Sequence, residues 1–528
     1  MKRILLSTLM LAGCFVLARA QDADRWWKHV SFLASDDLEG RNTGSEGHRK
    51  AAEYVAQQFA AAGLQPAGDT SGKNGFIQPV KFDVRKVIEE QSSLELVRNG
   101  KAEALKLGEE ANIAARGAPA PAAEAPLYFV GYGLTVPDLS FDDFKGLPLK
   151  GKVVVYITGG PKQIPGPLLA HFSSAGERGQ FLKASGAVGT ITIANPKITD
   201  VPWERATLAR LQPAMSLAEA ALNEGDGMKI AVNFNAKHAD KLLEGSGHTI
   251  AELLAIADRG EALPHFAIPG TIRSRVKMET SQVTSQNVAG VLPGTDPRLK
   301  NEFVAISAHL DHLGIGQPIN GDRIYNGAMD NASGVASLID MAQSFHDRKR
   351  AFKRSIVFVA VTGEEKGLLG SRYYAAHPTV NGPIVADLNM DMFLPLFPFK
   401  IMMVLGLDES DLGDVAREVA KQAGVAVQAD LEPQRNRFVR SDQYSFIRKG
   451  IPSLAFKDGY EPGSPQAEIS RKWIAERYHA PSDDLQQPVD KQAAADFNRV
   501  LGEIAATVAD RAERPKWKDA SFFKRFAK

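Results

Sequence analysis

Between residues 285 and 513, short apolar runs alternate with longer stretches whose apolar residues recur every three or four positions. The short runs predict buried strands, and the three- and four-residue spacing predicts amphipathic helices. Strands that alternate with helices are typical of an α/β fold, with a mostly parallel or mixed sheet and helices on both faces. The expected strands are "NVAGVL", "FVAISA", "SIVFVAV", "VADLNM" and "IPSLAF", and the expected helices cover 332–347, 367–377, 409–424, 441–449 and 489–513.

The first half of the chain follows a different pattern. Two helical patterns flank a Gly-rich loop, and the second runs from Ser45 to Ala62 and ends at Gly63. The segment 115–126, "ARGAPAPAAEAP", is rich in small residues and proline and is typical of a linker. Beyond it, "PLYFVGYGL" and "KGKVVVYI" begin a strand-rich stretch that ends near 275. We therefore expect a signal peptide (1–20), a first α/β segment (21–119), a small β-rich insertion (120–275) and the main α/β segment (276–528).

The N-terminus has the pattern of a secretory signal. Lys2 and Arg3 precede an apolar run, and Ala18-Arg19-Ala20 is a small-x-small cleavage site. We expect export to the periplasm or the medium. The alternative is a lipoprotein, because "LAGC" also matches a lipidation site that would place a lipid anchor on Cys14, the only cysteine of the chain.

Composition narrows the classes of function. The 528 residues are 44% hydrophobic and 24% charged, as in ordinary globular proteins. The formal charge is +1, and cleavage after Ala20 would remove three positive charges, so that +1 − 3 gives −2. No long run of one charge sign appears, which disfavours nucleic acid as a partner. No apolar run is long enough for a transmembrane segment. Without Cys14, no thiol remains for cysteine catalysis or zinc-thiolate binding.

Polar groups gather where the predicted strands end. "FVAISA" leads into His309-Leu310-Asp311-His312, and "SIVFVAV" is followed by the adjacent carboxylates Glu364 and Glu365. Ligands of α/β sheets bind beyond the carboxyl ends of the strands. Three further candidates are Asp330 before a helix, Asp391 after a strand and His479 in a late loop.

Each of these residues also has an ordinary interpretation. Asp330 could cap the helix that follows it, and a histidine after a strand is usually a hydrogen-bonded turn residue. Glu364 and Glu365 could be solvated at a helix start, where acidic residues are favoured. Taken together, however, the candidates are all His, Asp or Glu at one edge of the sheet. Imidazoles and carboxylates without thiolates suit zinc or a similar divalent ion.

Six fragments resemble, in order, the co-catalytic di-zinc aminopeptidases of the MH clan, which include bacterial leucyl aminopeptidases and relatives of glutamate carboxypeptidase. The fragments are "AHLDHLG", "IYNGAMDNASGVA", "VTGEEKGLLGS", "NMDMF", "SDQYSF" and "YHAPSDD". The stretch "LASDDLEGRNTGSEGHRKAAEYVAQQFAAAGLQPAG" is similar to the first helices of that family, and 127–275 resembles its protease-associated insertion. The resemblance implies a zinc exopeptidase fold over nearly all of the chain.

Carried over by position, the resemblance implies two zinc ions per chain and a peptide substrate. His309 and Asp391 would bind one zinc, Glu365 and His479 the other, and Asp330 would bridge them. Glu364 would be the general base, Tyr478 would polarise the scissile carbonyl, and Asp311 would hold the far nitrogen of His309. The bond after Asp330 would be cis. Gln443 departs from the commoner "SDH" and affects the expected wall of the substrate site.

Other functions remain open on the same fold. A glutamate-type carboxypeptidase would need a basic pocket, for which Arg435, Arg437 and Arg440 are candidates. A glutaminyl cyclase resembles a single-metal version of the site, and a non-catalytic binding protein would have lost ligands. The sequence favours a secreted metallo-aminopeptidase.

Overall fold

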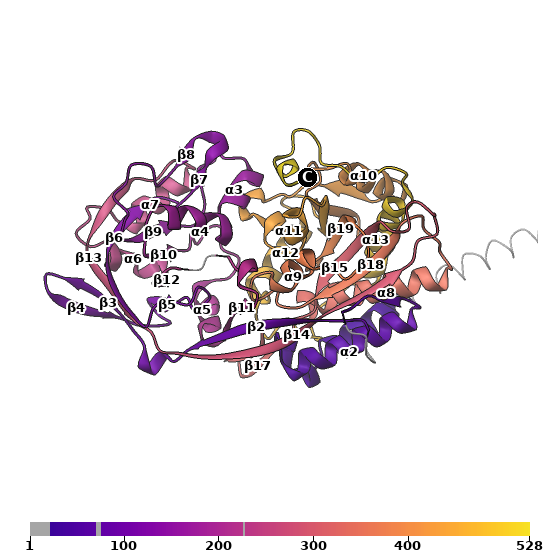
Figure 1. The fold of residues 1–528 in the computed structure, drawn as a ribbon, viewed down its shortest axis with the longest axis horizontal. Helices are drawn as coiled ribbons and strands as arrows, with labels where there is room; N and C mark the ends of the chain where they lie inside the picture. Colours follow the sequence, from indigo (N-terminus) through magenta and orange to yellow (C-terminus); the bar gives the residue numbers. More distant parts are fainter. Residues whose placement is uncertain (1–21, 70–74, 225–226, 528) are drawn as a thin grey trace, which may run out of the picture. The chain divides into compact units, whose positions relative to one another are not determined.

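The computed structural model describes residues 22–69, 75–224 and 227–527 (Figure 1). Positions 1–20, including Cys14, lie outside the described residues. The chain divides into two compact units. The first comprises residues up to Val80, Thr284–Leu431 and Arg440–Lys528. The second comprises Lys81–Val283 and Glu432–Val439.

The first unit is built on a mixed sheet with a parallel centre. Strands β18 (Ser355–Val361), β15 (Phe303–His309), β19 (Ile384–Met390) and β22 (Ser453–Asp458) are adjacent and parallel. Strand β14 (Met278–Leu292) pairs antiparallel with β18, and β20 (Ile401–Leu405) pairs antiparallel with β22. Every residue of β15, β18 and β19 is buried, as expected for strands covered on both faces. The predicted α/β fold class is confirmed.

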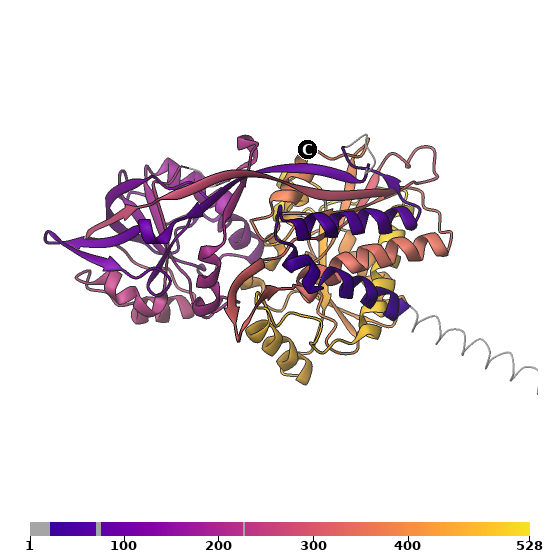
Figure 2. The same cartoon turned by 90° about the horizontal axis from the view of Figure 1, so that it is seen from below.

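Alternate residues of the central strands enter two different cores. Ile356, Phe358 and Ala360 belong to a large cluster that includes helices α2 (Glu46–Ala61), α8 (Ser333–Asp347) and α13 (Lys491–Asp510). Val357, Val359 and Val361 belong to a second cluster, which includes Tyr374 of α9 (Leu369–Ala376) and Phe446 of α11 (Gln443–Ile447). Helices α2 and α8 lie side by side (Figure 2). The two-residue period of the strands thus places helices on both faces.

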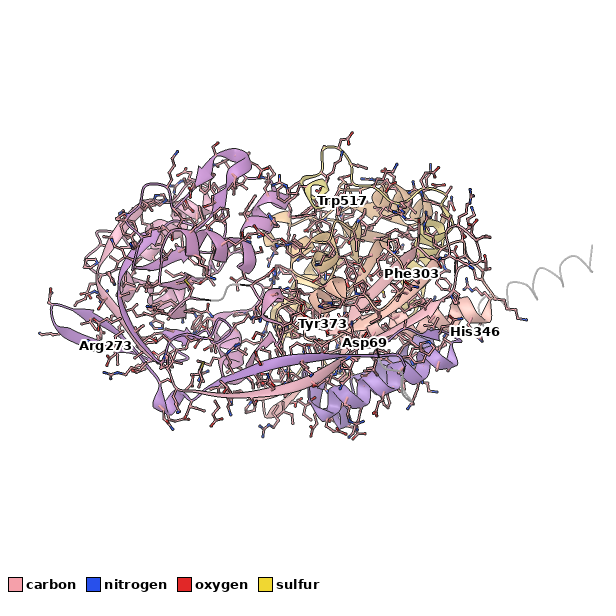
Figure 3. All side chains as sticks on the ribbon, in the orientation of Figure 1. Asp69, Arg273, Phe303, His346, Tyr373 and Trp517 are labelled. Carbon is pink, nitrogen blue, oxygen red and sulfur yellow. The ribbon has the colours of Figure 1, made fainter. Side chains whose placement is uncertain are left out.

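The predicted helices of this unit form close to their expected bounds. Ser45 caps α2 by accepting a hydrogen bond from the amide of His48. The segment expected as a helix over 409–424 forms α10 (Leu412–Gln422), and α13 is slightly shorter than the predicted 489–513. Phe303, labelled in Figure 3, marks the start of β15, and the opposite end of that strand leads to the candidate site.

The second unit has its own sheet and core. Its central strands β6 (Ala122–Val130), β9 (Val153–Ile157), β10 (Gly189–Ile193) and β12 (Ile230–Phe234) are parallel neighbours. Strand β13 (His265–Arg275) pairs antiparallel with β6 and β3 (Ser93–Arg98). The sheet continues through β4 (Lys101–Leu105) at one edge and β5 (Ala111–Ile113) at the other.

The bounds of this unit differ from the predicted 120–275. The unit begins at Lys81 and ends at Val283, because β3, β4 and β5 are strands of its sheet and not of the α/β unit. It also includes Glu432–Val439, where a short 3₁₀ turn (Pro433–Arg435) packs on α3 (Gly166–Phe172). The resemblance of this unit to a protease-associated domain stays a prediction.

The predicted linker 115–126 is partly wrong, because its second half forms the start of β6. Small residues and proline made this segment look irregular. Pro126, however, lies beside a register shift between Ile268 and Thr271 of the partner strand β13. Proline is tolerated at such irregularities because it cannot donate a ladder hydrogen bond.

The N-terminal helical segment, residues 22–33, contributes a buried histidine to the first unit. His29 is 4% exposed, and its ring nitrogens lie 2.8 Å from the Tyr54 hydroxyl and 3.3 Å from Oε1 of Gln343. Burial lowers the pKa of His29 from its ordinary 6.5 to about 4. Within the described residues, no helix combines the length and apolarity needed to span a bilayer.

His29 should make the fold sensitive to mild acid. Between pH 6.5 and about 4 the unfolded chain binds a proton at His29 that the folded chain does not. Stability should therefore fall as pH decreases through this window, by at most about 3 kcal/mol from this residue, and then level off. His29→Asn should flatten the decline in urea-unfolding free energy between pH 7 and 5. An unchanged slope would show that His29 titrates alike in both states.

Candidate metal centre

The parallel strands bring the polar segments to one edge of the sheet. His309 is the last residue of β15 and is paired in register with Val361, the last residue of β18. Glu364 and Glu365 follow β18 after a short turn, and Asp391 directly follows β19. The end of a buried strand therefore delivers each of these side chains to the same place.

Asp330 lies between two groups of potential ligands. Its Oδ1 is 3.2 Å from Nε2 of His309, and that same nitrogen is 3.5 Å from Oδ1 of Asp391. The other oxygen of Asp330, Oδ2, is 3.3 Å from Nε2 of His479. His479 Nε2 also lies 3.2 Å from Oε2 of Glu365. Each oxygen of one carboxylate thus faces a separate His and carboxylate pair, as expected of a bridging ligand.

A residue that was not predicted belongs to the second group. His312 is fully buried, with Nδ1 2.7 Å from Oε1 of Glu365 and 3.8 Å from Oδ2 of Asp330. His312, Asp330 and Glu365 form one of the clusters whose ligand atoms are close enough to hold an ion, and His309, Asp330 and Asp391 form another.

The residues fit a pair of zinc ions. Zinc bonds of 2.0–2.1 Å in tetrahedral geometry place ligand atoms roughly 3.3 Å apart, close to the separations around Asp330. Among the described residues, Nε2 of His309, both ring nitrogens of His312 and Oε1 of Glu365 are buried without a hydrogen-bond partner. Buried polar atoms of native proteins are normally paired, so their convergence fits cation binding. Oxygen and imidazole donors are those that zinc accepts.

The tautomer of His309 is set by a backbone group, not by the predicted carboxylate. Nδ1 of His309 donates to the carbonyl oxygen of Asp311 at 3.0 Å, which leaves Nε2 with its lone pair. The Asp311 carboxylate accepts from Thr43 Oγ1 at 2.8 Å and from the amides of Glu364 and Glu365 at 3.1 and 3.4 Å. Asp311 therefore fixes the loop that carries the two glutamates. The proposed contact between its side chain and His309 is wrong.

Asp330 is itself held by a residue that sequence reasoning did not assign. The Asp483 carboxylate accepts from the amides of Met329 and Asp330 at 2.9 and 3.0 Å. Asp483 comes from the "YHAPSDD" fragment, four residues after His479. The same loop therefore supplies the candidate ligand His479 and holds the backbone of a second candidate ligand, Asp330. The Asp330–Asn331 peptide bond is cis, as the resemblance implied.

A buried arginine ties together the segments that carry His312 and Asp330. Arg41 is fully buried and donates to the carbonyl oxygens of Leu310, Asn326 and Gly327, at 3.0, 2.7 and 3.0 Å. Gly327 has φ +60, and a Cβ there would lie 2.5 Å from Cγ of His312 and 2.2 Å from the carbonyl oxygen of Asp330. The glycine in "YNGAMDN" is thus required by the ring of His312 as well as by its own backbone conformation.

The predicted catalytic side chains lie in the electrostatic field of the cluster. Burial, and then the Asp391 and Glu365 carboxylates, raise the pKa of Glu364 well above its ordinary value. Burial, and then the Asp330 carboxylate, raise the pKa of Tyr478 above its ordinary value, which keeps its hydroxyl protonated. The rings of Tyr478 and His479 lie 4.0 Å apart. The Nζ atom of Lys457 donates to the carbonyl oxygen of Asp391 at 2.6 Å, another contact that was not predicted.

Two expectations about the substrate site change. Gln443 is fully buried and accepts from Asn389 at 2.8 Å, so it supports the sheet from within instead of forming an accessible wall. Two of the three arginines proposed for a basic pocket are engaged by acidic groups. Arg435 pairs with Asp200 and Glu432, and Arg437 pairs with Glu432 at 2.7 Å.

The fold and the site together define an α/β protein with two adjacent candidate sites for divalent metal that share one aspartate. Residues 287–505 match the model of peptidase family M28. The matched region contains the seven ligand and catalytic positions predicted from sequence: His309, Asp330, Glu364, Glu365, Asp391, Tyr478 and His479.

Some known proteins are similar to this chain in sequence, and some solved structures are similar to it in fold. A probable leucine aminopeptidase 2 of Aspergillus oryzae is 28% identical over 43% of this chain and 46% of its own length. The solved aminopeptidase from Aneurinibacillus sp. strain AM-1 is 20% identical, covers 93% of this chain and 95% of its own, and has a TM-score of 0.54. A zinc aminopeptidase from Bacillus subtilis is 18% identical, with a TM-score of 0.50 and coverage of 93% and 96%. The structural likeness concerns the fold alone. The chain spans about half the length of the curated relatives it matches.

Gly327 should be intolerant of a side chain. Gly327→Ala should lower the free energy of unfolding by about 2–5 kcal/mol, since a left-handed alanine costs about 1–2 and the overpacking against His312 and the Asp330 carbonyl costs more. Gly424→Ala is the matched control, with φ +72 and no atom within 4 Å of the added Cβ. Chemical unfolding of both variants measures the difference. Equal losses would mean that the ring of His312 does not occupy this space.

Proposed function

We propose that the protein is a zinc-dependent aminopeptidase that removes N-terminal residues from peptides. The observation that carries the proposal is the position of Asp330, whose two oxygens face two separate His and carboxylate groups. The match of residues 287–505 to peptidase family M28 and the names of the similar proteins support the same activity.

Two zinc ions per chain are part of the proposal. His309 and Asp391 would hold one, Glu365 and His479 the other, and Asp330 would contribute one oxygen to each. When bound, the ions would supply the Lewis acidity that makes a water molecule acidic and polarises a carbonyl group. The three carboxylates would offset most of the charge of two divalent cations, which explains how so many acidic groups can lie together at this depth.

The chain's own residues would move the proton and orient the substrate. The Glu364 carboxylate, next to Glu365 in sequence but not a ligand, would accept the proton from the attacking water and pass it to the leaving amine. The Tyr478 hydroxyl, kept protonated by its raised pKa, would donate a hydrogen bond to the developing oxyanion. Asp311 would hold Glu364 in place through the amide of that residue.

The alternatives have weaker support. A glutamate-type carboxypeptidase needs unpaired positive charge for an acidic end group, and Asp200 and Glu432 already engage Arg435. A glutaminyl cyclase resembles a single-metal version of the site, whereas potential ligands lie close to both oxygens of Asp330. A non-catalytic binding protein would not need to keep these ligands.

Hydrolysis of a panel of substrates tests the activity. Amino-acid anilides and free-N-terminal peptides should be cleaved, N-acetylated peptides should not be cleaved, and N-terminal glutamine substrates should not cyclise to pyroglutamate. A metal chelator should abolish the activity and zinc should restore it. Release of C-terminal glutamate from N-blocked peptides would favour the carboxypeptidase instead.

Export remains part of the proposal as well. Cleavage after Ala20 would release the chain to the periplasm or the medium, and lipidation of Cys14 is the alternative. The N-terminal sequence and the mass of the mature protein distinguish them, because a lipoprotein would begin at a modified Cys14.

Glu364 and Glu365 should behave differently although they are neighbours. Glu365→Gln should lower the zinc content toward one ion per chain and reduce thermal stability, because metal binding to the native state adds to the free energy of folding. Glu364→Gln should keep both ions and nearly normal substrate binding, while turnover falls by roughly 10²–10⁴. Metal analysis of dialysed protein and steady-state rates on one anilide measure both effects.

The reverse result is informative. Loss of metal from Glu364→Gln, with retention by Glu365→Gln, would exchange the two roles. Unchanged turnover in both variants would show that neither glutamate takes part in the reaction and would remove the basis for the proposed mechanism.

A further inference from the structure

The turn that carries Glu364 is held by buried side chains from two other segments of the chain. The amide of Glu364 donates to Oδ1 of Asp311 at 3.1 Å. Two residues earlier, the amide of Thr362 donates to Oδ1 of Asn287 at 2.9 Å. Asn287 and Asp311 are both fully buried. The backbone of this turn, and with it the direction in which the Glu364 side chain leaves the chain, therefore depends on how firmly these side chains are held.

Thr43, in the loop before α2, holds the Asp311 carboxylate. Thr43 is 3% exposed, and its hydroxyl donates to Oδ2 of Asp311 at 2.8 Å. The same oxygen accepts from the amide of Glu365 at the longer distance of 3.4 Å. A buried carboxylate is stable only when donors surround it. The Thr43 hydroxyl gives Oδ2 the shorter of these two hydrogen bonds and so restricts rotation of the Asp311 side chain.

The next residue of the same loop reaches the turn by a second route. The amide of Gly44 donates to Oγ of Ser285 at 3.1 Å, and this hydroxyl lies 2.7 Å from Oγ1 of Thr362. Ser285 and Thr362 are both fully buried. Two consecutive residues of one loop thus connect to the Glu364 turn, Thr43 through Asp311 and Gly44 through Ser285. The whole network lies within the first unit.

The hydrogen bond of a buried threonine often serves stability alone. The position of Thr43 suggests more, because the carboxylate that it holds binds the amide of the proposed base. In the proposed mechanism a zinc ion would also hold Glu365, whereas Glu364 is not a ligand. The orientation of Glu364 therefore depends more on its backbone, and so on Asp311, than that of Glu365 does.

We infer that Thr43 is a positioning residue for Glu364, which it orients through Asp311. The inference rests on the proposed aminopeptidase activity. It extends the site to the N-terminal loop, outside the residues 287–505 that match the peptidase family. When the hydroxyl is removed, Oδ2 of Asp311 keeps the longer bond from Glu365, and the Glu364 turn loosens. A misplacement of about 1 Å can lower a rate by roughly 10²-fold.

Thr43→Val tests this role because valine keeps the shape of threonine and removes the hydroxyl. With one amino-acid anilide as substrate and saturating zinc, kcat should fall at least about tenfold while KM changes by less than about twofold. The zinc content of the dialysed variant should equal that of the wild type. Thr43→Ser restores a hydroxyl and should recover most of the lost kcat. Thr43→Ala also lacks the hydroxyl, should show the same loss of kcat, and replaces the valine variant if that variant does not fold.

Thr135→Val is the matched control. Thr135 is 8% exposed in the second unit, and its hydroxyl donates to Oδ1 of Asp142 at 2.9 Å, so this variant also loses a threonine–aspartate hydrogen bond. It should lose stability in urea unfolding, as Thr43→Val does, but keep the wild-type kcat.

Three results would overturn the inference while leaving the proposed activity intact. The first is a Thr43→Val enzyme that loses stability with an unchanged kcat, as expected of a purely structural hydroxyl. The second is a Thr43→Ser enzyme that recovers none of the lost kcat. The third is loss of zinc from Thr43→Val, which would mean that the hydroxyl supports the ligand Glu365 and not the base. A wild type that hydrolyses neither anilides nor peptides would overturn the proposed function, and this inference with it.

Discussion

The Asp330 carboxylate, placed between two groups of buried ligands, is the constraint on which the rest of the site depends. One oxygen lies near His309 and the other near His479, and these histidines come from segments far apart in the sequence. Asp483 holds the backbone of Asp330, and Arg41 holds the loop before it. A shift of Asp330 would therefore disturb both ligand groups together.

The concentration of carboxylates explains much of the surrounding architecture. Asp330, Glu364, Glu365 and Asp391 meet at the ends of fully buried strands, where like charges repel strongly. Histidines, backbone amides and the proposed metal ions offset this repulsion. Lys457, which donates to the carbonyl of Asp391, adds a nearby positive charge. The same gathered carboxylates thus determine both the stability of this edge of the sheet and its proposed chemistry.

Sequence patterns were sufficient where local periodicity decides the structure. The apolar runs that end at His309 and before Glu364 could only be buried strands, and parallel pairing then brings their ends together. Beyond the end of a strand, the sequence has no periodic pattern from which the direction of a side chain can be predicted. For that reason His312 could not be distinguished from a turn residue, and the carbonyl of Asp311 could not be preferred over its carboxylate. The unit boundaries were misplaced because β3 and β13 pair across a long separation in sequence, and a strand containing Pro126 resembles a linker.

Metal analysis of Asp330→Asn tests the central claim most directly. The substitution keeps the volume of the side chain but removes the charge and one of the two equivalent oxygens that face the ligand groups. If Asp330 bridges two ions, dialysed wild-type protein should contain two zinc ions per chain, and Asp330→Asn should weaken both and retain fewer than one. Retention of two ions by the variant, or of one tightly bound ion with unchanged affinity, would contradict the shared role of this carboxylate.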